Sequence, residues 1–185
     1  MAVLGVSVVG LLLGLAVVPV AAGPTLCPPD SVQSGTVCMD KYEASVWDLT
    51  GVPGGTKPKL VKAIQGGTVT LADLLAAGAV QRGLALGDLA AAGCPDTGNG
   101  CVNVYAVSIP GVTPATFITW FQAAAAARNS LKRLPTNQEW QVAALGTPDG
   151  APCNLSGPTL AVTGTAGCVS DVGAFDMVGD RKSVV

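Results

Sequence analysis

The sequence contains no histidine, few aromatic residues and few charges. Of its 185 residues, none is His, 4% are aromatic and 12% are charged, with 10 Lys and Arg against 12 Asp and Glu. Without histidine the chain cannot form a Ser-His-Asp triad, a Cys-His pair, a histidine-bearing zinc helix or a histidine-ligated iron site. The formal net charge of −2 provides no basic surface for sequence-independent binding of nucleic acid, so we expect no nucleic-acid partner.

Glycine, proline and hydrophobic residues are abundant instead. The chain has 24 Gly, 13 Pro and 49% hydrophobic residues. This composition differs from the compositions of coiled coils and of charged disordered segments. We therefore expect a folded, turn-rich chain whose length suits a single domain.

The first 22 residues form an apolar leader. Residues 1–22 carry no charged side chain, Pro19 breaks the apolar run, and Val20-Ala21-Ala22 resembles a signal peptidase site. These features predict a signal peptide cleaved after residue 22 or 23, and hence an extracytoplasmic protein, either secreted or periplasmic. The alternative is an N-terminal anchor, since about 18 or more apolar residues can span a bilayer. Only an uncleaved leader would attach the protein to a membrane.

The six cysteines form three local couples. Thiols of an exported protein become disulfides in an oxidising compartment. The simplest of many connectivities pairs neighbours in the sequence, namely Cys27 with Cys38, Cys94 with Cys101, and Cys153 with Cys168. No two cysteines have C-x-x-C spacing and no histidine assists them, so we expect no metal on these thiols.

The pattern of apolar residues predicts both helices and strands. Alternation predicts strands over residues 37–47 and 102–109, and Gly and Pro predict a loop over residues 51–59. We expect a helix beginning after Thr70, a short helix within residues 85–92, and a helix over residues 117–129. The irregular order of these elements favours an α+β fold.

Several aromatic side chains are expected in the core. Helical spacing places Phe117, Trp120, Phe121 and Ala124 on one face of the helix over 117–129, which we expect to be buried. Trp47, Trp120 and Trp140 lie in apolar surroundings, and core packing is the default expectation for them.

A capping box predicts a further helix from Thr136 to Gly146. Thr136 is followed three residues later by Glu139, whose carboxylate can bond back to the cap amide. We therefore interpret Glu139 as a helix cap rather than a catalytic acid. Lys132 and Arg133 precede this helix, and we expect a solvated surface or a salt bridge to Asp40 or Glu43.

Three motifs together resemble the formylglycine-generating enzyme family, also called the sulfatase-modifying factor family. They are Asp40-Lys41-Tyr42-Glu43, the run Lys132-Arg133-Leu134-Pro135-Thr136-Asn137-Gln138-Glu139-Trp140, and Gly173-Ala174-Phe175-Asp176-Met177-Val178-Gly179. The likeness covers about residues 37 to 179. It implies a C-type-lectin-like α+β fold with low regular secondary structure.

The likeness stops before the end of the family's domain. After Gly179 the family has Asn and then a Trp-Glu-Trp-like run, whereas this chain has Asp180-Arg181-Lys182-Ser183-Val184-Val185. We therefore expect residues 23–185 to form a partial family domain that is incomplete at its C-terminus.

The resemblance carries implications for cofactors. Complete generating enzymes oxidise a sulfatase cysteine to formylglycine, with oxygen as oxidant and copper held by two thiolates, and none of the six cysteines here matches that pair. We therefore expect no catalytic residue and no cofactor in this chain. The family's iron-dependent branch, the sulfoxide synthases, needs histidine and is excluded.

Family members also bind calcium near the D-M-V-G turn. Asp176 and Gly179 match two of the calcium ligands, but Ser183 stands where a ligating Glu is expected. Calcium binding at Asp176 and Gly179 is thus one hypothesis. The alternative is that Asp176 is a turn residue.

Two functions from different classes follow. In the first, the protein is an exported relative of the formylglycine-generating oxidoreductases and is inactive alone. In the second, it is a secreted, non-catalytic, lectin-like module that binds an as yet unidentified protein or glycan.

Overall fold

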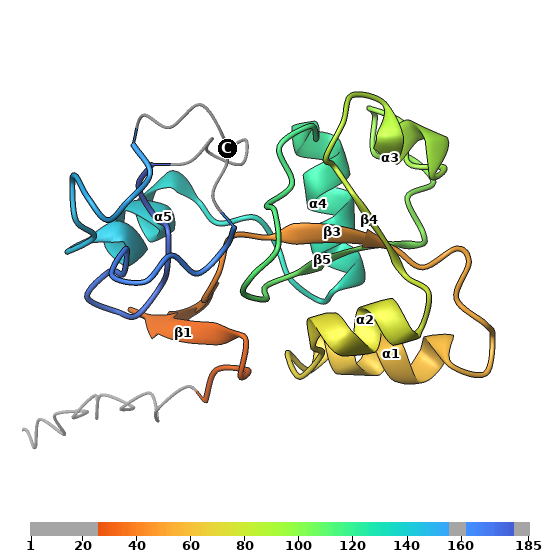
Figure 1. The fold of residues 1–185 in the computed structure, drawn as a ribbon, viewed down its shortest axis with the longest axis horizontal. Coiled ribbons are helices and arrows are strands. Elements are labelled where there is room, and N and C mark those ends of the chain that lie inside the picture. The colour runs from red at the N-terminus through yellow and green to blue at the C-terminus, as the bar shows by residue number, and fades with distance from the viewer. Residues whose placement is uncertain (1–25, 156–161, 180–185) are drawn as a thin grey trace, which may run out of the picture.

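The computed structural model describes residues 26–155 and 162–179 and has ten short elements of regular structure (Figure 1). The predicted leader, its cleavage site and Ser183 lie outside these residues. The elements in chain order are β1 (Ser31–Ser34), β2 (Val37–Asp40), β3 (Ser45–Asp48), α1 (Lys57–Gln65), α2 (Leu71–Ala76), β4 (Val80–Arg82), α3 (Asp88–Ala91), β5 (Val104–Val107), α4 (Trp120–Asn129) and α5 (Asn137–Ala144). The fold is α+β with little regular secondary structure, as expected.

A three-stranded antiparallel sheet forms the centre, in the order β4-β3-β5. In Figure 1, α4 lies on one side of this sheet and α1 and α2 on the other. All four residues of β3 and of β5 are buried, because both faces of the two strands are covered. Successive residues of a strand point to opposite faces of the sheet. Trp47 therefore packs in the core beneath α1 and α2, whereas its neighbour Val46 packs in the core beneath α4.

A separate part of the molecule contains the β1–β2 hairpin and α5. The two strands pair antiparallel with Ser34 opposite Val37 across a tight turn. Met39 of the hairpin packs with Ala143 of α5 and with Ala174 and Met177 near the end of the described chain. Figure 1 shows this part beside the sheet, with the chain passing from the hairpin into β3.

Three helices begin with the same hydrogen-bonding motif, a capping box. Thr70, Thr119 and Thr136 each accept a hydrogen bond from the N3 amide, and the N3 side chain bonds back to the cap amide. The boxes at Thr70 and Thr136 confirm the sequence prediction. The box of Thr119 with Gln122 was not predicted, and it starts α4 at Trp120 rather than at Phe117.

Two predicted boundaries were wrong. The strand expected over residues 37–47 is two strands in different sheets, because β2 pairs with β1 whereas β3 pairs with β4 and β5. The loop expected over residues 51–59 contains the start of α1, with Pro58 in its first turn. Proline is tolerated there because first-turn amides have no partner within the helix.

The prediction of a buried aromatic face on α4 was also wrong. Phe117, Trp120 and Phe121 are 43%, 48% and 57% exposed. The helix instead turns Ala124, Ala125, Ala126 and Ala127 inward, and these small side chains let it pack closely on β5. Among the tryptophans Trp47 is buried as expected, at 2% exposed, whereas Trp140 is half-buried.

Three disulfides join the cysteines in sequence order. The pairs are Cys27–Cys38, Cys94–Cys101 and Cys153–Cys168, with Cα atoms 5.5, 4.3 and 4.9 Å apart. Each therefore closes a local loop. Within the part of the chain that the structure describes, no helix has both the length and the hydropathy to span a bilayer.

Candidate functional site

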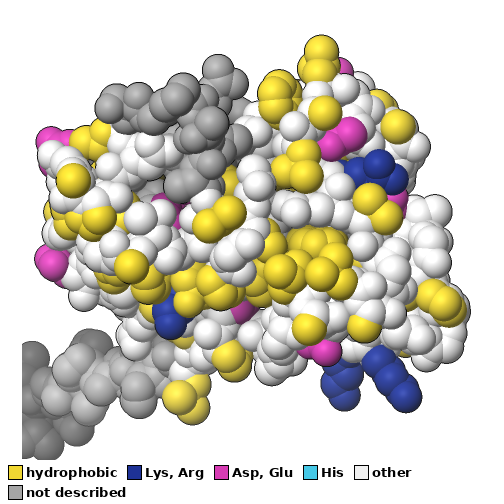
Figure 2. Space-filling model, viewed as in Figure 1, with side chains coloured by type: hydrophobic (Ala, Val, Ile, Leu, Met, Phe, Trp, Pro, Cys, Tyr) yellow, Lys and Arg dark blue, Asp and Glu magenta, His cyan; other side chains and the backbone are white. Residues whose placement is uncertain are grey.

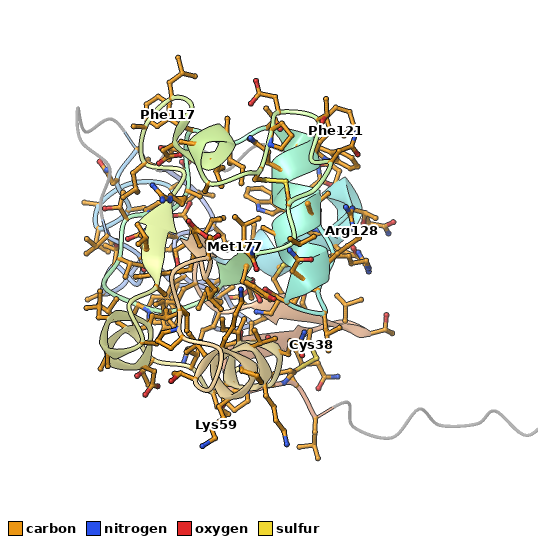
Figure 3. The ribbon with its side chains drawn as sticks, turned by 90° about the vertical axis from the view of Figure 1, so that its right-hand side faces the viewer. Cys38, Lys59, Phe117, Phe121, Arg128 and Met177 are labelled. Carbon is orange, nitrogen blue, oxygen red and sulfur yellow. A yellow bond between two sulfur atoms is a disulfide. The ribbon has the colours of Figure 1, made fainter. Side chains whose placement is uncertain are left out.

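A groove of about 260 Å³ lies between the sheet with α4 and the part of the molecule that contains α5. One wall comes from α4 and the β2–β3 connection, and the other from residues 132–137, Trp140 and the segment 175–179. Figure 3 shows Met177 of this segment near the middle of the molecule, with Phe117 and Phe121 at one end. Each of the three motifs that carry the family resemblance therefore contributes residues to one groove.

Small side chains create the space in the groove. Five alanines line it: Ala44, Ala106, Ala115, Ala123 and Ala127. Two of these lie on the α4 face that begins with Trp120, at the i+3 and i+7 positions. The alanine run of α4 thus supplies both the inner packing face of the helix and part of one wall of the groove. No periodicity in the sequence distinguishes these two roles, so the sequence did not reveal the groove.

Four aromatic side chains line the groove: Tyr42, Trp120, Trp140 and Phe175. The rings of Tyr42 and Phe175 stack with centroids 5.1 Å apart. Nζ of Lys41 lies 5.6 Å from the Tyr42 centroid and 5.9 Å from the Phe175 centroid, within cation–π range of both rings. Trp120 contacts Phe121 edge to face at 5.4 Å. Apolar side chains also gather across the middle of the face shown in Figure 2.

Lys132 forms a partly buried ion cluster beside the groove. Its Nζ donates to Oδ2 of Asp30 at 2.5 Å and to Oδ1 of Asp40 at 2.6 Å. Of the alternatives that the sequence left open for Lys132, the structure has the salt bridge to Asp40. Burial raises the pKa of Asp40 despite the nearby ammonium. Burial also opposes the charge on Lys132, but Asp40 and Asp30 together raise its pKa above the ordinary value.

Arg133 pairs with Glu139 rather than with Asp40. Its guanidinium donates two hydrogen bonds to the carboxylate, at 2.7 and 2.5 Å. The Thr136 amide donates a further bond to Glu139 at 2.8 Å. The Arg133 guanidinium and the Thr136 amide lower the pKa of Glu139 to about 2. Glu139 is thus an ionised helix cap, which is unsuited to the role of general acid.

Asp176 is buried and anchors a turn. Its Oδ2 accepts hydrogen bonds from the Gly164 amide at 2.6 Å and the Thr165 amide at 3.2 Å. Gly179 has φ of 81°, and a Cβ there would lie 2.7 Å from the Asn154 carbonyl oxygen. The turn-residue alternative therefore agrees with the geometry of Asp176.

The described residues supply only part of a calcium shell. A Ca²⁺ ion takes about six to eight oxygen ligands, whereas the Asp176 carboxylate is already occupied by amides. Within residues 26–155 and 162–179, no group of three or more His, Cys, Asp or Glu is placed to hold a metal ion. These residues do not fit a calcium site by themselves.

The six cysteines do not fit a copper site either. All of them are oxidised in disulfides, and a disulfide sulfur is not the thiolate that would ligate copper. No side chain is therefore assigned a role in copper or oxygen chemistry.

Comparison with known proteins identifies the family. A family model described as the sulfatase-modifying factor enzyme 1-like domain matches residues 38–180. No curated protein and no solved structure was found to match the chain. The matched range contains the groove and extends over most of the sequence, and the protein therefore belongs to the sulfatase-modifying factor family, whose domain is consistent with a C-type-lectin-like fold.

Proposed function

We propose that this chain provides a non-catalytic binding domain of the sulfatase-modifying factor family, in an oxidising compartment outside the cytoplasm. The aromatic groove between the sheet and α5 is the binding site. The family match and the groove support this function, and the three disulfides support the compartment.

The main support for a non-catalytic function is that all six cysteines form disulfides. The family's oxidoreductases hold copper through two thiolates, and this chain offers no reduced cysteine for such a site. Two of the acidic side chains that line the groove also make hydrogen bonds: Asp40 bonds to Lys132, and Asp176 to backbone amides. A domain that has a groove lined by aromatic side chains and no free thiol is suited to binding a ligand.

Two measurements test the absence of catalysis. Titration of the denatured, unreduced protein with a thiol reagent should find no free thiol, and the reduced control should give all six. The protein is incubated with copper, oxygen and a sulfatase-type cysteine peptide. Oxygen consumption should not exceed that of a control that contains copper and the peptide but no protein. Copper-dependent oxygen uptake with formation of the peptide aldehyde would overturn the proposal.

A matched pair of variants tests the binding site. Trp120 lines the groove, whereas the adjacent Phe121 does not, and both side chains are about half exposed. Glycan and peptide arrays are probed with the wild type, Trp120→Ala and Phe121→Ala. We expect retained ligands to be lost with Trp120→Ala only. Equal loss with both variants, or no retained ligand, would contradict a role for the groove.

The second candidate is an oxidoreductase, and the family match is the observation that favours it. Gene sequence past codon 179, read in all three frames, separates the two functions. An Asn, a Trp-Glu-Trp-like run and a later cysteine pair would favour the enzyme. A stop codon, or a complete domain without that pair, would favour the binding module.

A further inference from the structure

We propose that the Cys27–Cys38 disulfide is a site of thiol–disulfide exchange, at which a dithiol reductant attacks Cys38 and releases the segment before β1. The reaction takes place at the β1–β2 hairpin and does not depend on a ligand in the groove. It rests on the exposure of this disulfide, on a pocket beside Cys38, and on the contacts of the segment that the disulfide holds.

The three disulfides differ in their access to solvent. Four cysteines are buried, with exposed fractions of 0, 5, 7 and 1% for Cys94, Cys101, Cys153 and Cys168. Cys38, in contrast, is exposed, and Cys27 is half-buried. The neighbour of Cys38 in β2, Met39, packs in the core, so the alternation of a strand turns Cys38 outward. Exchange requires that a thiolate reach a disulfide sulfur, and the Cys27–Cys38 disulfide is therefore the most open to attack.

A second pocket, of about 540 Å³, lies beside this disulfide. Cys38 lines the pocket together with polar side chains that include Ser31, Gln65 and Glu139, whereas Cys27 is not in its lining. In Figure 3, Cys38 lies well away from the aromatic side chains at the start of α4. The pocket gives a small, water-soluble thiol room to approach Cys38, so we expect attack at Sγ of Cys38 rather than at that of Cys27.

The exchange proceeds in two steps. A thiolate of the reductant attacks Cys38 Sγ, the disulfide bond breaks, and Cys27 leaves as a thiolate that takes a proton from water. A mixed disulfide then joins Cys38 to the reductant. The second thiolate of the reductant attacks the reductant's own sulfur in this bond and expels Cys38, which is protonated in turn. Two electrons pass from the dithiol, which becomes a disulfide, to the protein, which gains two thiols.

The segment before β1 contacts three parts of the fold that are distant in sequence. The carbonyl oxygen of Asp30 accepts hydrogen bonds from the Lys41 amide and from the Ser108 hydroxyl, both at 2.9 Å. The Asp30 carboxylate pairs with Lys132. The disulfide ties this segment covalently to β2. Without that tie the segment should leave its contacts more often, and Lys132 would lose one of its two carboxylate partners.

Limited reduction of the native protein tests the site. The full chain is treated with dithiothreitol without denaturant, quenched with N-ethylmaleimide at successive times, and analysed by peptide mass spectrometry. We expect Cys27 and Cys38 to be labelled at least about tenfold faster than the four buried cysteines, whose disulfides react only after local opening. In denatured protein the three disulfides should react at similar rates. Earlier or equal reduction of another disulfide in the native protein, or an equal preference in the denatured protein, would overturn the proposal.

Capture of the mixed disulfide identifies the sulfur that is attacked. With the monothiol mercaptoethanol and an acid quench, the adduct should be found on Cys38, and an adduct on Cys27 would overturn the assignment. The double variant Cys27→Ala/Cys38→Ala should lose the fast labelling, whereas Cys94→Ala/Cys101→Ala should keep it. Circular dichroism melts show whether each variant is folded, and the experiments on the wild type decide the proposal without them.

Hydrogen exchange of the selectively reduced protein tests the release of the segment. The amide of Lys41 should exchange at least about tenfold faster than in the oxidised protein, because its acceptor on Asp30 moves away. The amide of Ala123 in α4, which bonds to Thr119, is the control and should keep its rate. Unchanged exchange at Lys41, or equal acceleration at Ala123, would overturn the local release.

Discussion

Lys132 and Asp40 lie 92 positions apart in the sequence, and their Nζ and Oδ1 atoms are 2.6 Å apart in the fold. Lys132 also contacts Asp30, so a single ammonium joins the chain after α4 to the β1–β2 hairpin and the turn before it. The side chain of Lys132 is 19% exposed, which limits the screening of both contacts by water.

Replacement of Lys132 should destabilise the protein strongly. Lys132→Met keeps much of the side chain's length but leaves Asp30 and Asp40 without their shared counter-ion. We expect a loss of about 3 kcal/mol in the free energy of unfolding, because a buried charge loses its partner. Urea denaturation measures the loss, and Lys59→Met, at an exposed position of α1, is the control. A similar effect of both substitutions would contradict a special role for Lys132.

Glu139 should make the stability of the folded protein depend on pH in the acidic range. Its pKa is about 2 in the folded chain against an ordinary value of 4.5, so the folded state favours the ionised form. This contribution is fully present above pH 4.5 and is lost as the pH falls through about 2. Glu139→Gln retains a capping side chain but removes the charge. Between these pH values, melting temperatures of the variant should fall less steeply than those of the wild type; parallel curves would refute the assignment.

Truncation of two tryptophans should change the stability of the protein by very different amounts. Trp47 is 2% exposed and its Nε1 donates to Ser45 Oγ, whereas Trp120 is 48% exposed. Trp47→Ala should cost about 3–5 kcal/mol through the cavity that it leaves. Trp120→Ala should change stability by about 0.5 kcal/mol or less, as is usual for surface positions. Guanidinium denaturation of both variants checks the contrast, and a large loss with Trp120→Ala would place that ring in the core.

The Cys94–Cys101 disulfide should stabilise the start of α4. The loop that it closes accepts hydrogen bonds from this helix start, at the carbonyl oxygens of Cys94 and Asp96. Replacement of both cysteines by alanine should cost about 2 kcal/mol, since the unfolded chain regains the freedom of a short loop.

Hydrogen exchange distinguishes this local effect from a general one. The amides of Gln122 and Ala123 should exchange faster in the double-alanine variant, because the Thr119 cap loses its rigid support. Amides of Leu60 and Ile64, in the core on the other side of the sheet, serve as the internal control. Uniform acceleration at all four positions would contradict the local role.

Features that depend on near neighbours were predictable without the fold. The capping boxes at Thr70 and Thr136 join residues three positions apart, so their hydrogen bonds need only a helical turn. The disulfides pair cysteines at most 15 residues apart. The three family motifs are also continuous runs, and the family match agrees with them.

The orientation of helix faces and the groove depended on contacts between distant segments. The pattern of α4 permits either an aromatic or an alanine face toward the sheet, and burial selected the alanines because they allow close packing on β5. The break between β2 and β3 arises since each pairs with a different strand. The groove forms where side chains from β3, β5, α4 and α5 come together. No local pattern in the sequence predicts that these elements are neighbours. Short stretches of sequence thus determined the local hydrogen bonds. The burial of each side chain was determined by the surfaces that the tertiary structure brings into contact.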